Sequence, residues 1–322
     1  MKYSIIITEQ NCEKYLIKCL DSIANQTYRD FEVIVIDDAS KNRKDYLIKK
    51  YNQLCIRYIY LEESKGCGGA RNIGMQNITG DYVCFVDSDD WWDLHYLEIA
   101  DIALRKTDAD IGMMGLLREY DVKMPEPIYK CKYDREYLLS GEIAFKIMTY
   151  QYDMGIKIIP AATNKLYKRT FLQKNQISFL DNISFEDLPY NFRAMRIAEK
   201  VVAIPDALYH HYRRMGSIVQ SFREKNIDDI VTGFTLIRND MVRDGVYEQY
   251  RNNYYCFFEH FYNLIVRQIF EFVPDEKNKK DLLSLSLHKM KEILIPDEFM
   301  EYMSAEILRR HIQPSITDTT IY

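Results

Sequence analysis

Acidic side chains gather at two points of the sequence, each directly after a short apolar run. The pair Asp37-Asp38 follows Phe31–Ile36, and Asp87–Asp90, which contains three aspartates, follows Tyr82–Val86. Carboxylates held this close repel one another unless a cation lies among them. Oxygen ligands favour Mg²⁺ or Mn²⁺, and a hard cation held by one or two carboxylates usually takes phosphate oxygens as further ligands. The spacing therefore predicts a site for a divalent metal and a diphosphate.

The segment Asp87–Asp90 has a second explanation. Aspartate and serine are common N-cap residues, so these side chains could simply cap a helix that starts near Trp91. Taken alone, the segment does not choose between the two explanations. The pair Asp37-Asp38 at the end of a neighbouring apolar run favours the metal and diphosphate site.

Strand-like apolar runs alternate with helical patterns over the first part of the chain. The runs are Tyr3–Ile7, Phe31–Ile36, Ile56–Leu61, Tyr82–Val86 and Ile111–Leu117. Between them we expect a helix around Tyr15–Ile23, a charged helical stretch after Ser40, a glycine-rich turn at Gly66–Gly69 and a helix within Ala70–Ile78. This alternation is typical of the α/β class, with a mostly parallel central sheet flanked by helices.

Ligands of such sheets bind beyond the carboxyl ends of the strands, which leaves a short set of candidate polar residues. They are Thr8, Asp37-Asp38, the segment Gly66–Arg71 and Asp87–Asp90. The glycine-rich segment is not a dinucleotide-binding fingerprint, because Arg71 stands where the last glycine belongs and the segment follows the third strand rather than the first.

Composition places the chain among ordinary globular proteins. It has 322 residues, 47% hydrophobic and 28% charged, and 43 Lys and Arg against 48 Asp and Glu give a net charge of −5. Phosphate-backbone binding rests on an excess of basic residues, so we expect no nucleic-acid partner. The seven cysteines form no Cys-x-x-Cys pair and indicate free thiols in a reducing compartment. Without a leader-like N-terminus or a run long enough to span a bilayer, the sequence predicts a cytoplasmic protein, at most peripheral to the membrane.

The last part of the chain has a different pattern, with apolar side chains at helical spacing. One stretch holds Ile227, Ile230, Phe234, Ile237 and Met241, and a second holds Phe257, Phe258, Phe261, Ile265 and Ile269. We therefore expect a catalytic-sized domain at residues 1–222 and a helical region at residues 223–322. The helical region would pack on that domain or on a partner subunit, which leaves a homo-oligomer through these helices open.

Two pairs of aromatic side chains have alternative interpretations. Trp91-Trp92 could stack on a sugar ring or pack beneath a lid. His210-His211 lie on an extended segment and point to opposite faces, so packing or hydrogen bonding is expected, with a contact to sugar or phosphate as the alternative.

Several short motifs follow one another in order over roughly the first two-thirds of the chain. They are Ser4–Asn11, Gln26-Thr27, Glu32–Ser40, Gly69–Gly74, Gly80–Val83, Phe85–Asp90, Asn164–Tyr167, Glu186–Leu188, Tyr212-Arg213 and Gly216–Ile218. Their order resembles that of the family 2 glycosyltransferases. The resemblance implies a single A-type glycosyltransferase domain with a C-terminal helical extension.

The resemblance also implies roles for the residues that match family motifs. Asp38 resembles the carboxylate that accepts a hydrogen bond from the uracil ring, and Thr8 resembles its neighbour in the base pocket. Arg71 resembles the arginine that reaches the nucleotide. Asp87 and Asp89 match the Asp-x-Asp motif, with Asp89 as the direct ligand of Mn²⁺ or Mg²⁺ and Asp87 nearer the ribose and sugar.

Further roles follow in the second half of the matching region. Asp187, beside Glu186, resembles the general base that takes the proton from the acceptor hydroxyl. Arg213 and Ser217 resemble a segment that closes over the diphosphate. Without the resemblance, Glu186-Asp187 would be interpreted as the acidic first turn of a helix. The sequence departs from the family at Gln10, where an aromatic residue that stacks on uracil is common.

Together these resemblances imply an inverting, metal-dependent glycosyltransferase that uses a nucleotide-diphosphate sugar, first of all a UDP-sugar. The implied acceptor is a hydroxyl of a glycan or lipid-linked glycan in cell-surface polysaccharide or glycolipid synthesis. The alternative is a non-catalytic module that binds sugar nucleotides or glycans and keeps the fold. A nucleotidyltransferase is disfavoured, because Thr8–Lys14 is not a glycine-rich basic phosphate loop.

Overall fold

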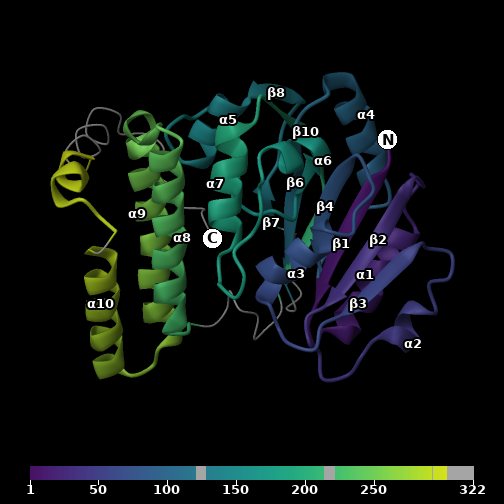
Figure 1. The fold of residues 1–322 in the computed structure, drawn as a ribbon, viewed down its shortest axis with the longest axis horizontal. Helices are drawn as coiled ribbons and strands as arrows, with labels where there is room; N and C mark the ends of the chain where they lie inside the picture. The colour runs from purple at the N-terminus through teal and green to yellow at the C-terminus, as the bar shows by residue number, and fades with distance from the viewer. Residues whose placement is uncertain (121–127, 214–221, 292, 303–322) are drawn as a thin grey trace. The chain divides into compact units, whose positions relative to one another are not determined.

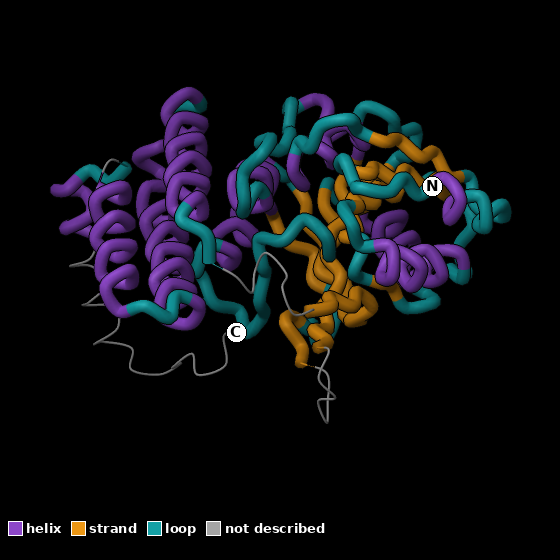
Figure 2. The backbone as a smooth tube through the Cα atoms, turned by 90° about the horizontal axis from the view of Figure 1, so that it is seen from below, coloured by secondary structure: helices purple, strands orange, loops and turns teal. Residues whose placement is uncertain are grey.

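A computed structural model describes residues 1–120, 128–213, 222–291 and 293–302. The chain divides into two compact units, residues 1–221 and residues 222–322. The units differ in secondary structure. The strands, orange in Figure 2, belong to the first unit, whereas the described part of the second unit contains helices and loops.

One sheet forms the centre of the first unit. Its strands are β1 (Tyr3–Glu9), β2 (Phe31–Asp37), β3 (Ile56–Tyr60), β4 (Tyr82–Asp87), β5 (Trp91–Trp92), β6 (Ile111–Tyr120), β7 (Ile128–Cys131), β8 (Tyr137–Ser140), β9 (Lys165–Lys168) and β10 (Lys200–Arg213). They lie in the order β3-β2-β1-β4-β9-β6-β10-β5, with β7 paired to β6 and β8 paired to β10 (Figure 1).

Each of the five predicted strands is present. The neighbours β3, β2, β1 and β4 run parallel, and β6 and β10 form a second parallel pair. Strand β9 joins these two parts and is antiparallel to both β4 and β6. The central strand β1 has no polar alternation because both of its faces are covered, and Ile5, Ile6 and Ile7 are fully buried.

Helices cover both faces of the sheet. They are α1 (Glu13–Ala24), α2 (Asp45–Ile48), α3 (Gly66–Met75), α4 (Tyr96–Thr107), α5 (Gly141–Met148), α6 (Arg169–Lys174) and α7 (Asp187–Ile197). Phe85 of β4 packs against Tyr190 of α7, whereas its neighbour Cys84 faces the other way and lies near Tyr96 of α4. The charged stretch after Ser40 yields only α2, in which Leu47 is the buried side chain.

The glycine-rich segment is helical, which corrects the predicted turn at Gly66–Gly69. Helix α3 begins at Gly66 and not at Ala70. A Cβ atom at Gly68 would lie 2.2 Å from the carbonyl oxygen of Leu180. The glycine therefore allows the first turn of α3 to lie directly against the backbone that precedes α7. The sequence pattern predicts a glycine-rich turn because this close approach is not visible locally.

The helix-cap explanation for Asp87–Asp90 is wrong. Trp91-Trp92 form β5, and the next helix, α4, begins only at Tyr96. Asp90 is buried and accepts hydrogen bonds from the Tyr209 hydroxyl at 2.5 Å and the Tyr212 backbone N–H at 2.9 Å. This carboxylate therefore ties the end of β4 to β10.

The aromatic pairs after β4 and in β10 make packing contacts. Trp92 is buried and stacks on Tyr96, with ring centroids 4.1 Å apart. The Trp91 ring stacks on His210 at 5.4 Å, and the Lys18 ammonium lies 2.8 Å from its centroid. Nδ1 of His210 also lies 2.6 Å from a carboxylate oxygen of Glu119. These contacts favour the packing interpretation for Trp91, Trp92 and His210.

The second unit contains α8 (Lys225–Arg243), α9 (Tyr247–Phe272) and α10 (Glu276–Lys291). The two predicted apolar faces are confirmed, because all ten of their residues are buried. Phe234 of α8 meets Phe258 and Tyr254 of α9 with ring centroids 5.3 and 5.7 Å apart. Among the helices that the structure describes, none combines the length and apolarity needed to cross a bilayer.

Candidate active site

The carboxyl ends of three parallel strands meet at one edge of the sheet. Thr8 is paired with Asp87 across β1 and β4, and Glu9 is paired with Asp37 across β1 and β2. The Thr8 hydroxyl lies 3.4 Å from an Asp87 carboxylate oxygen and 3.5 Å from the sulfur of Cys67. The structure therefore brings the candidate residues of three strand ends together with the start of α3.

Arg71 is the centre of a group that we name the arginine cluster: Arg71, Asp87, Glu186 and Asp187. Nη2 of Arg71 donates to Asp87 at 2.9 Å, and Nη1 donates to Glu186 at 2.9 Å and to Asp187 at 2.6 Å. The Arg71 side chain is only 3% exposed, whereas that of Asp87 is 36% exposed. Three carboxylates share one guanidinium, so the ionised cluster keeps an excess of negative charge that a further cation would offset.

Aromatic side chains form the wall behind Arg71. The Phe179 ring centroid lies 5.2 Å from the guanidinium carbon and that of Phe85 lies 5.9 Å away. Phe179 in turn stacks on Tyr190, with centroids 3.8 Å apart. Burial alone would lower the pKa of Arg71, but the charge of Asp187 and the other carboxylates raises it well above its ordinary value. In this poorly hydrated setting, the hydrogen bonds that orient the carboxylates are stronger than they would be in water.

Asp187 is held from two sides. It is the first residue of α7, one oxygen accepts from Arg71, and the other accepts from the backbone N–H of Ala162 at 3.1 Å.

Burial raises the pKa of Asp187, and Arg71 opposes that rise. Burial also raises the pKa of Glu186 to about 7, with Arg71 lowering it and Asp187 raising it. Phe185 precedes both with φ +63°, a left-handed backbone that non-glycine residues rarely adopt. A carboxylate with a raised pKa is the better proton acceptor.

Lys165 holds the loop that donates to Asp187. Its buried ammonium donates to the carbonyl oxygens of Ile159 at 2.7 Å and Ala161 at 2.5 Å. Burial lowers the pKa of Lys165 to about 8. By fixing two carbonyls of the loop, Lys165 fixes the direction of the adjacent Ala162 N–H and so supports the position of Asp187.

Asp38 lies at the end of β2 and is satisfied by neutral donors. One carboxylate oxygen accepts from the Lys65 backbone N–H at 2.7 Å and the other from the Ser64 hydroxyl at 2.6 Å. Gln10 donates to the Asp38 carbonyl oxygen at 2.7 Å and to Ser64 at 3.2 Å. At the position where the family commonly has a stacking aromatic, this chain therefore has a side chain that connects the β2 end to the loop before α3.

The turn after β4 fits a hard divalent cation in its chemistry. Asp87 and Asp89 offer carboxylate oxygens, and Asp87 is partly exposed at the strand end. Across the residues that the structure describes, no three acidic, histidine or cysteine side chains are gathered into a ready metal site. Mg²⁺ is typically held by one or two carboxylates plus substrate phosphates, so this donor set suits a cation that arrives with a diphosphate.

The structure describes only one of the two residues that are predicted to close over the diphosphate. Arg213 is the last residue of β10 and is half-buried. Ser217 lies outside the described residues. The closing role of this pair stays a prediction.

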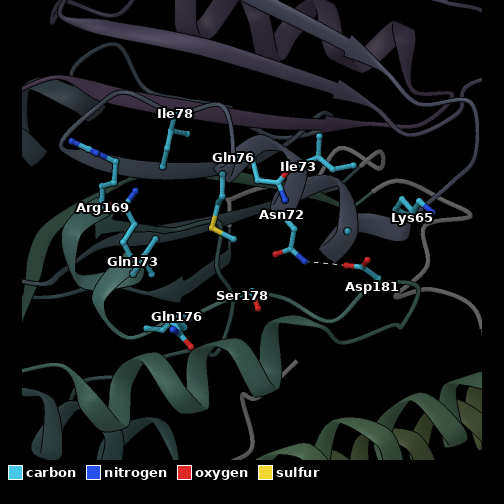
Figure 3. A pocket seen from close by; sticks show the side chains of 14 residues that line it. Lys65, Asn72, Ile73, Gln76, Ile78, Arg169, Gln173, Gln176, Ser178 and Asp181 are labelled. Carbon is cyan, nitrogen blue, oxygen red and sulfur yellow. Dashed lines mark hydrogen bonds between the residues drawn. The ribbon is translucent and has the colours of Figure 1, made fainter.

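A cavity of about 590 Å³ lies on a side of α3 other than the one that carries Arg71. Its lining includes Gly69, Asn72, Ile73 and Gln76, whose spacing places them on one face of the helix, with Arg71 turned away. Figure 3 shows Asn72 in the cavity wall with its side chain directed at Asp181. The cavity is therefore separate from the arginine cluster.

Comparison with known proteins assigns the family. Residues 4–175 match the family described as Glycosyl transferase family 2, and the chain belongs to it. It is 30% identical over 249 residues to Glycosyltransferase GlyA of Streptococcus pneumoniae, covering 74% of this chain and 35% of that protein. It is 28% identical over 216 residues to the poly(ribitol-phosphate) beta-N-acetylglucosaminyltransferase TarS of Staphylococcus aureus, covering 66% and 35%. It is also 28% identical over 312 residues to the cholesterol galactosyltransferase of Borreliella burgdorferi, covering 92% and 83%.

The fold is shared with a solved structure. The crystal structure of S. aureus TarS 1-349 in complex with UDP-GlcNAc superposes with a TM-score of 0.61 at 20% identity, covering 97% of this chain and 93% of that one. This likeness confirms the predicted fold class. The chain spans only about a third of the full length of GlyA and TarS.

Sequence reasoning missed two residues that support this site, Asn72 and Lys165. Both lie inside motifs that carry the family resemblance, Gly69–Gly74 and Asn164–Tyr167. Membership of a motif was the signal in the sequence, because most of their partners are backbone groups whose positions the sequence pattern does not give.

Proposed function

We propose that the chain is an inverting glycosyltransferase that moves a sugar from a nucleotide-diphosphate donor, first of all a UDP-sugar, to a hydroxyl of a glycan or lipid-linked glycan. The observation that carries the proposal is Asp187, a half-buried carboxylate that Arg71 binds, with a raised pKa, at the edge of the sheet where ligands of such folds bind. A module that only binds sugar nucleotides has no need for such a proton acceptor. Membership of the family supports the same reaction.

The chemistry assigns each residue a task. Asp187 takes the proton from the acceptor hydroxyl as its oxygen attacks the anomeric carbon, and the bond from that carbon to the diphosphate oxygen breaks on the opposite face. Arg71 and the Ala162 N–H keep Asp187 oriented for this transfer. Asp89 and Asp87 would hold Mn²⁺ or Mg²⁺, which when bound stabilises the negative charge on the diphosphate. Attack from the face opposite the leaving group inverts the anomeric configuration.

The names of the relatives indicate which classes of sugar and acceptor to test first. They include an N-acetylglucosaminyltransferase and a galactosyltransferase, so a hexosyl or N-acetylhexosaminyl group is the proposed cargo. UDP-GlcNAc is the first donor to test, because the matching TarS structure was solved with it. We propose an acceptor in cell-surface polymer or glycolipid synthesis, reached from the cytoplasmic face of the membrane, since TarS is named for poly(ribitol-phosphate) and another relative for cholesterol.

Thermal unfolding with nucleotides tests the binding half of the proposal. The melting temperature is measured with UDP, UDP-GlcNAc, UDP-galactose and GDP, each with and without Mn²⁺. Binding to the folded state stabilises it by about 2.7 kcal/mol at a hundredfold excess over the dissociation constant. We expect a UDP shift that needs Mn²⁺ and is lost in Asp89→Ala. The matched control is Asp81→Ala, an aspartate at the other end of β4 that accepts from the Lys2 N–H.

Release of UDP from UDP-sugars then tests catalysis. A Mn²⁺-dependent shift together with release of UDP supports the enzyme. A UDP shift that is unchanged in Asp89→Ala would refute the metal assignment. Binding without release of UDP from any UDP-sugar, with or without added glycan acceptors, would favour the non-catalytic module instead.

A further inference from the structure

The segment before α7, residues 177–186, is attached to α3 near its start by the side chain of Asn72. The Asn72 amide oxygen accepts from the Phe179 backbone N–H at 2.9 Å. Its amide nitrogen donates to the Phe179 carbonyl oxygen at 3.0 Å and to the Asp181 carboxylate at 3.0 Å. Asn72 therefore satisfies both backbone groups of Phe179, as a neighbouring strand would, across a sequence separation of 107 residues.

Other contacts show that this attachment is close and well defined. The Asn182 N–H donates to the Lys65 carbonyl oxygen at 2.8 Å, just before α3 begins. Gly68 lets Leu180 approach so closely that a Cβ atom would lie 2.2 Å from its carbonyl oxygen. Because the backbones of this segment and of α3 are already in contact, a small shift of the segment cannot form a new hydrogen bond in place of one that is lost.

The attached segment leads directly into the arginine cluster. The Phe179 ring stacks on Tyr190 of α7 and forms the wall behind Arg71. Six residues after Phe179 comes Phe185, and then Glu186 and Asp187, which Arg71 binds. Asn72 is the next residue after Arg71 in α3. One turn of helix thus holds both the carboxylates and the segment that carries them.

We propose that Asn72 is a positioning residue for sugar transfer, which sets the place of Asp187 by fixing the backbone of Phe179. It touches no reacting atom, and the inference rests on the proposed role of Asp187 as the base. A general base that is misplaced by about 1 Å can lose a hundredfold in rate. We expect binding of the UDP-sugar to depend on the ends of β2 and β4, so it should not require Asn72.

The test compares steady-state kinetics of Asn72→Ala with the wild type, using UDP-GlcNAc and Mn²⁺ below the melting temperature of both. We expect kcat to fall by about a hundredfold, while KM for the UDP-sugar and the Mn²⁺-dependent UDP shift stay at the wild-type values. The matched control is Asn77→Ala, since Asn77 follows the same helix and contacts Ile73 and Arg57. We expect this control to keep the wild-type kcat. A wild-type kcat in folded Asn72→Ala would overturn the proposal.

Exchanging the amide of Asn72 and the carboxylate of Asp181 separates a positioning role from a general effect on stability. Asn72→Asp removes both donated hydrogen bonds and places two carboxylates together. Adding Asp181→Asn restores a donor opposite the new carboxylate. We expect kcat to drop in the single variant and to recover in part in the double variant. A merely structural role would change the melting temperature but leave kcat per folded molecule unchanged.

Hydrogen exchange gives a readout that does not depend on activity. In Asn72→Ala we expect faster amide exchange in residues 178–187 and unchanged exchange in β1 and β4. Unchanged exchange in that segment would overturn the proposal. If the wild type releases no UDP from any UDP-sugar, the proposed function fails, and exchange still decides whether Asn72 holds the segment.

Discussion

Two acidic sites lie along the same edge of the sheet and are stabilised in opposite ways. At the end of β2, backbone N–H groups and hydroxyls donate to Asp37 and Asp38, from Ser40, Tyr58, Ser64 and Lys65. At the end of β4, Asp87 instead shares the buried guanidinium of Arg71 with Glu186 and Asp187. We refer to the first as the β2 site and compare it with the arginine cluster.

Under the proposed function, we expect this difference to separate recognition from chemistry. Neutral donors fix the shape of the β2 site without changing its charge, which suits a carboxylate that reads the N–H group of a base. In the arginine cluster, charge is balanced only in part, and burial raises the pKa of Glu186 and of Asp187. Perturbed pKa values of this kind are typical of catalytic sites.

The largest effect is expected from a substitution in the arginine cluster. Asp187→Asn keeps an oxygen that accepts from Arg71 but removes the proton acceptor, so we expect kcat to fall by about a thousandfold with UDP binding retained. The matched change in the β2 site, Asp38→Asn, should weaken UDP binding while kcat at saturating UDP-sugar persists. Release of UDP and thermal shifts measure both. Equal losses of kcat in the two variants would show that the sites are not separate.

A smaller effect is expected on stability as the pH changes. The pKa of Glu186 is raised to about 7 from an ordinary 4.5, so the folded state keeps this proton where the unfolded chain has lost it. That contribution to the free energy of unfolding is complete below about pH 4.5 and is lost as the pH rises through 7. Glu186→Gln stays neutral, so relative to the wild type it should gain stability on going from pH 5 to pH 8.

Urea unfolding at pH 5 and pH 8 measures this change. We expect the relative gain of Glu186→Gln to be on the order of 1 kcal/mol or more. Glu142→Gln is the surface control, because Glu142 pairs with Lys146 at an exposed position on α5. A relative gain in Glu142→Gln as large as that in Glu186→Gln, or none in either, would contradict a raised Glu186 pKa as the cause.

Much of this edge could be predicted from the sequence because strand ends follow from apolar runs. Once the runs ending near Thr8, Asp38 and Asp87 are assigned to parallel strands, these residues must share one edge. The family resemblance added Asp187, and a role for Arg71, which lies far from Asp187 along the chain. The two kinds of stabilisation could not be predicted, since Ser64 and Lys65 reach Asp38 from a loop whose course depends on tertiary packing.

The local errors have the same physical origin. Gly66–Gly69 has the composition of a turn, and the approach of Leu180 to Gly68 explains why glycine is required there inside a helix. Asn72 and Lys165 act on backbone groups of Phe179 and of the loop before Ala162, and no spacing within their own elements indicates those partners.

The smallest effect is expected at Gln10, where this chain departs from its family. Gln10 donates to the Asp38 carbonyl oxygen and to Ser64, so Gln10→Ala should weaken UDP binding slightly through a less fixed β2 site. Gln10→Tyr loses the same bonds but offers a ring to stack on the base, a contact of roughly 1–3 kcal/mol in nucleic-acid sites. We therefore expect Gln10→Tyr to bind UDP more tightly than Gln10→Ala in thermal shifts with Mn²⁺. Equal weakening in both would mean that no base stacks at this position. The kcat at saturating UDP-sugar should stay constant, because the hydrogen bonds of Gln10 go to the β2 site and not to the arginine cluster.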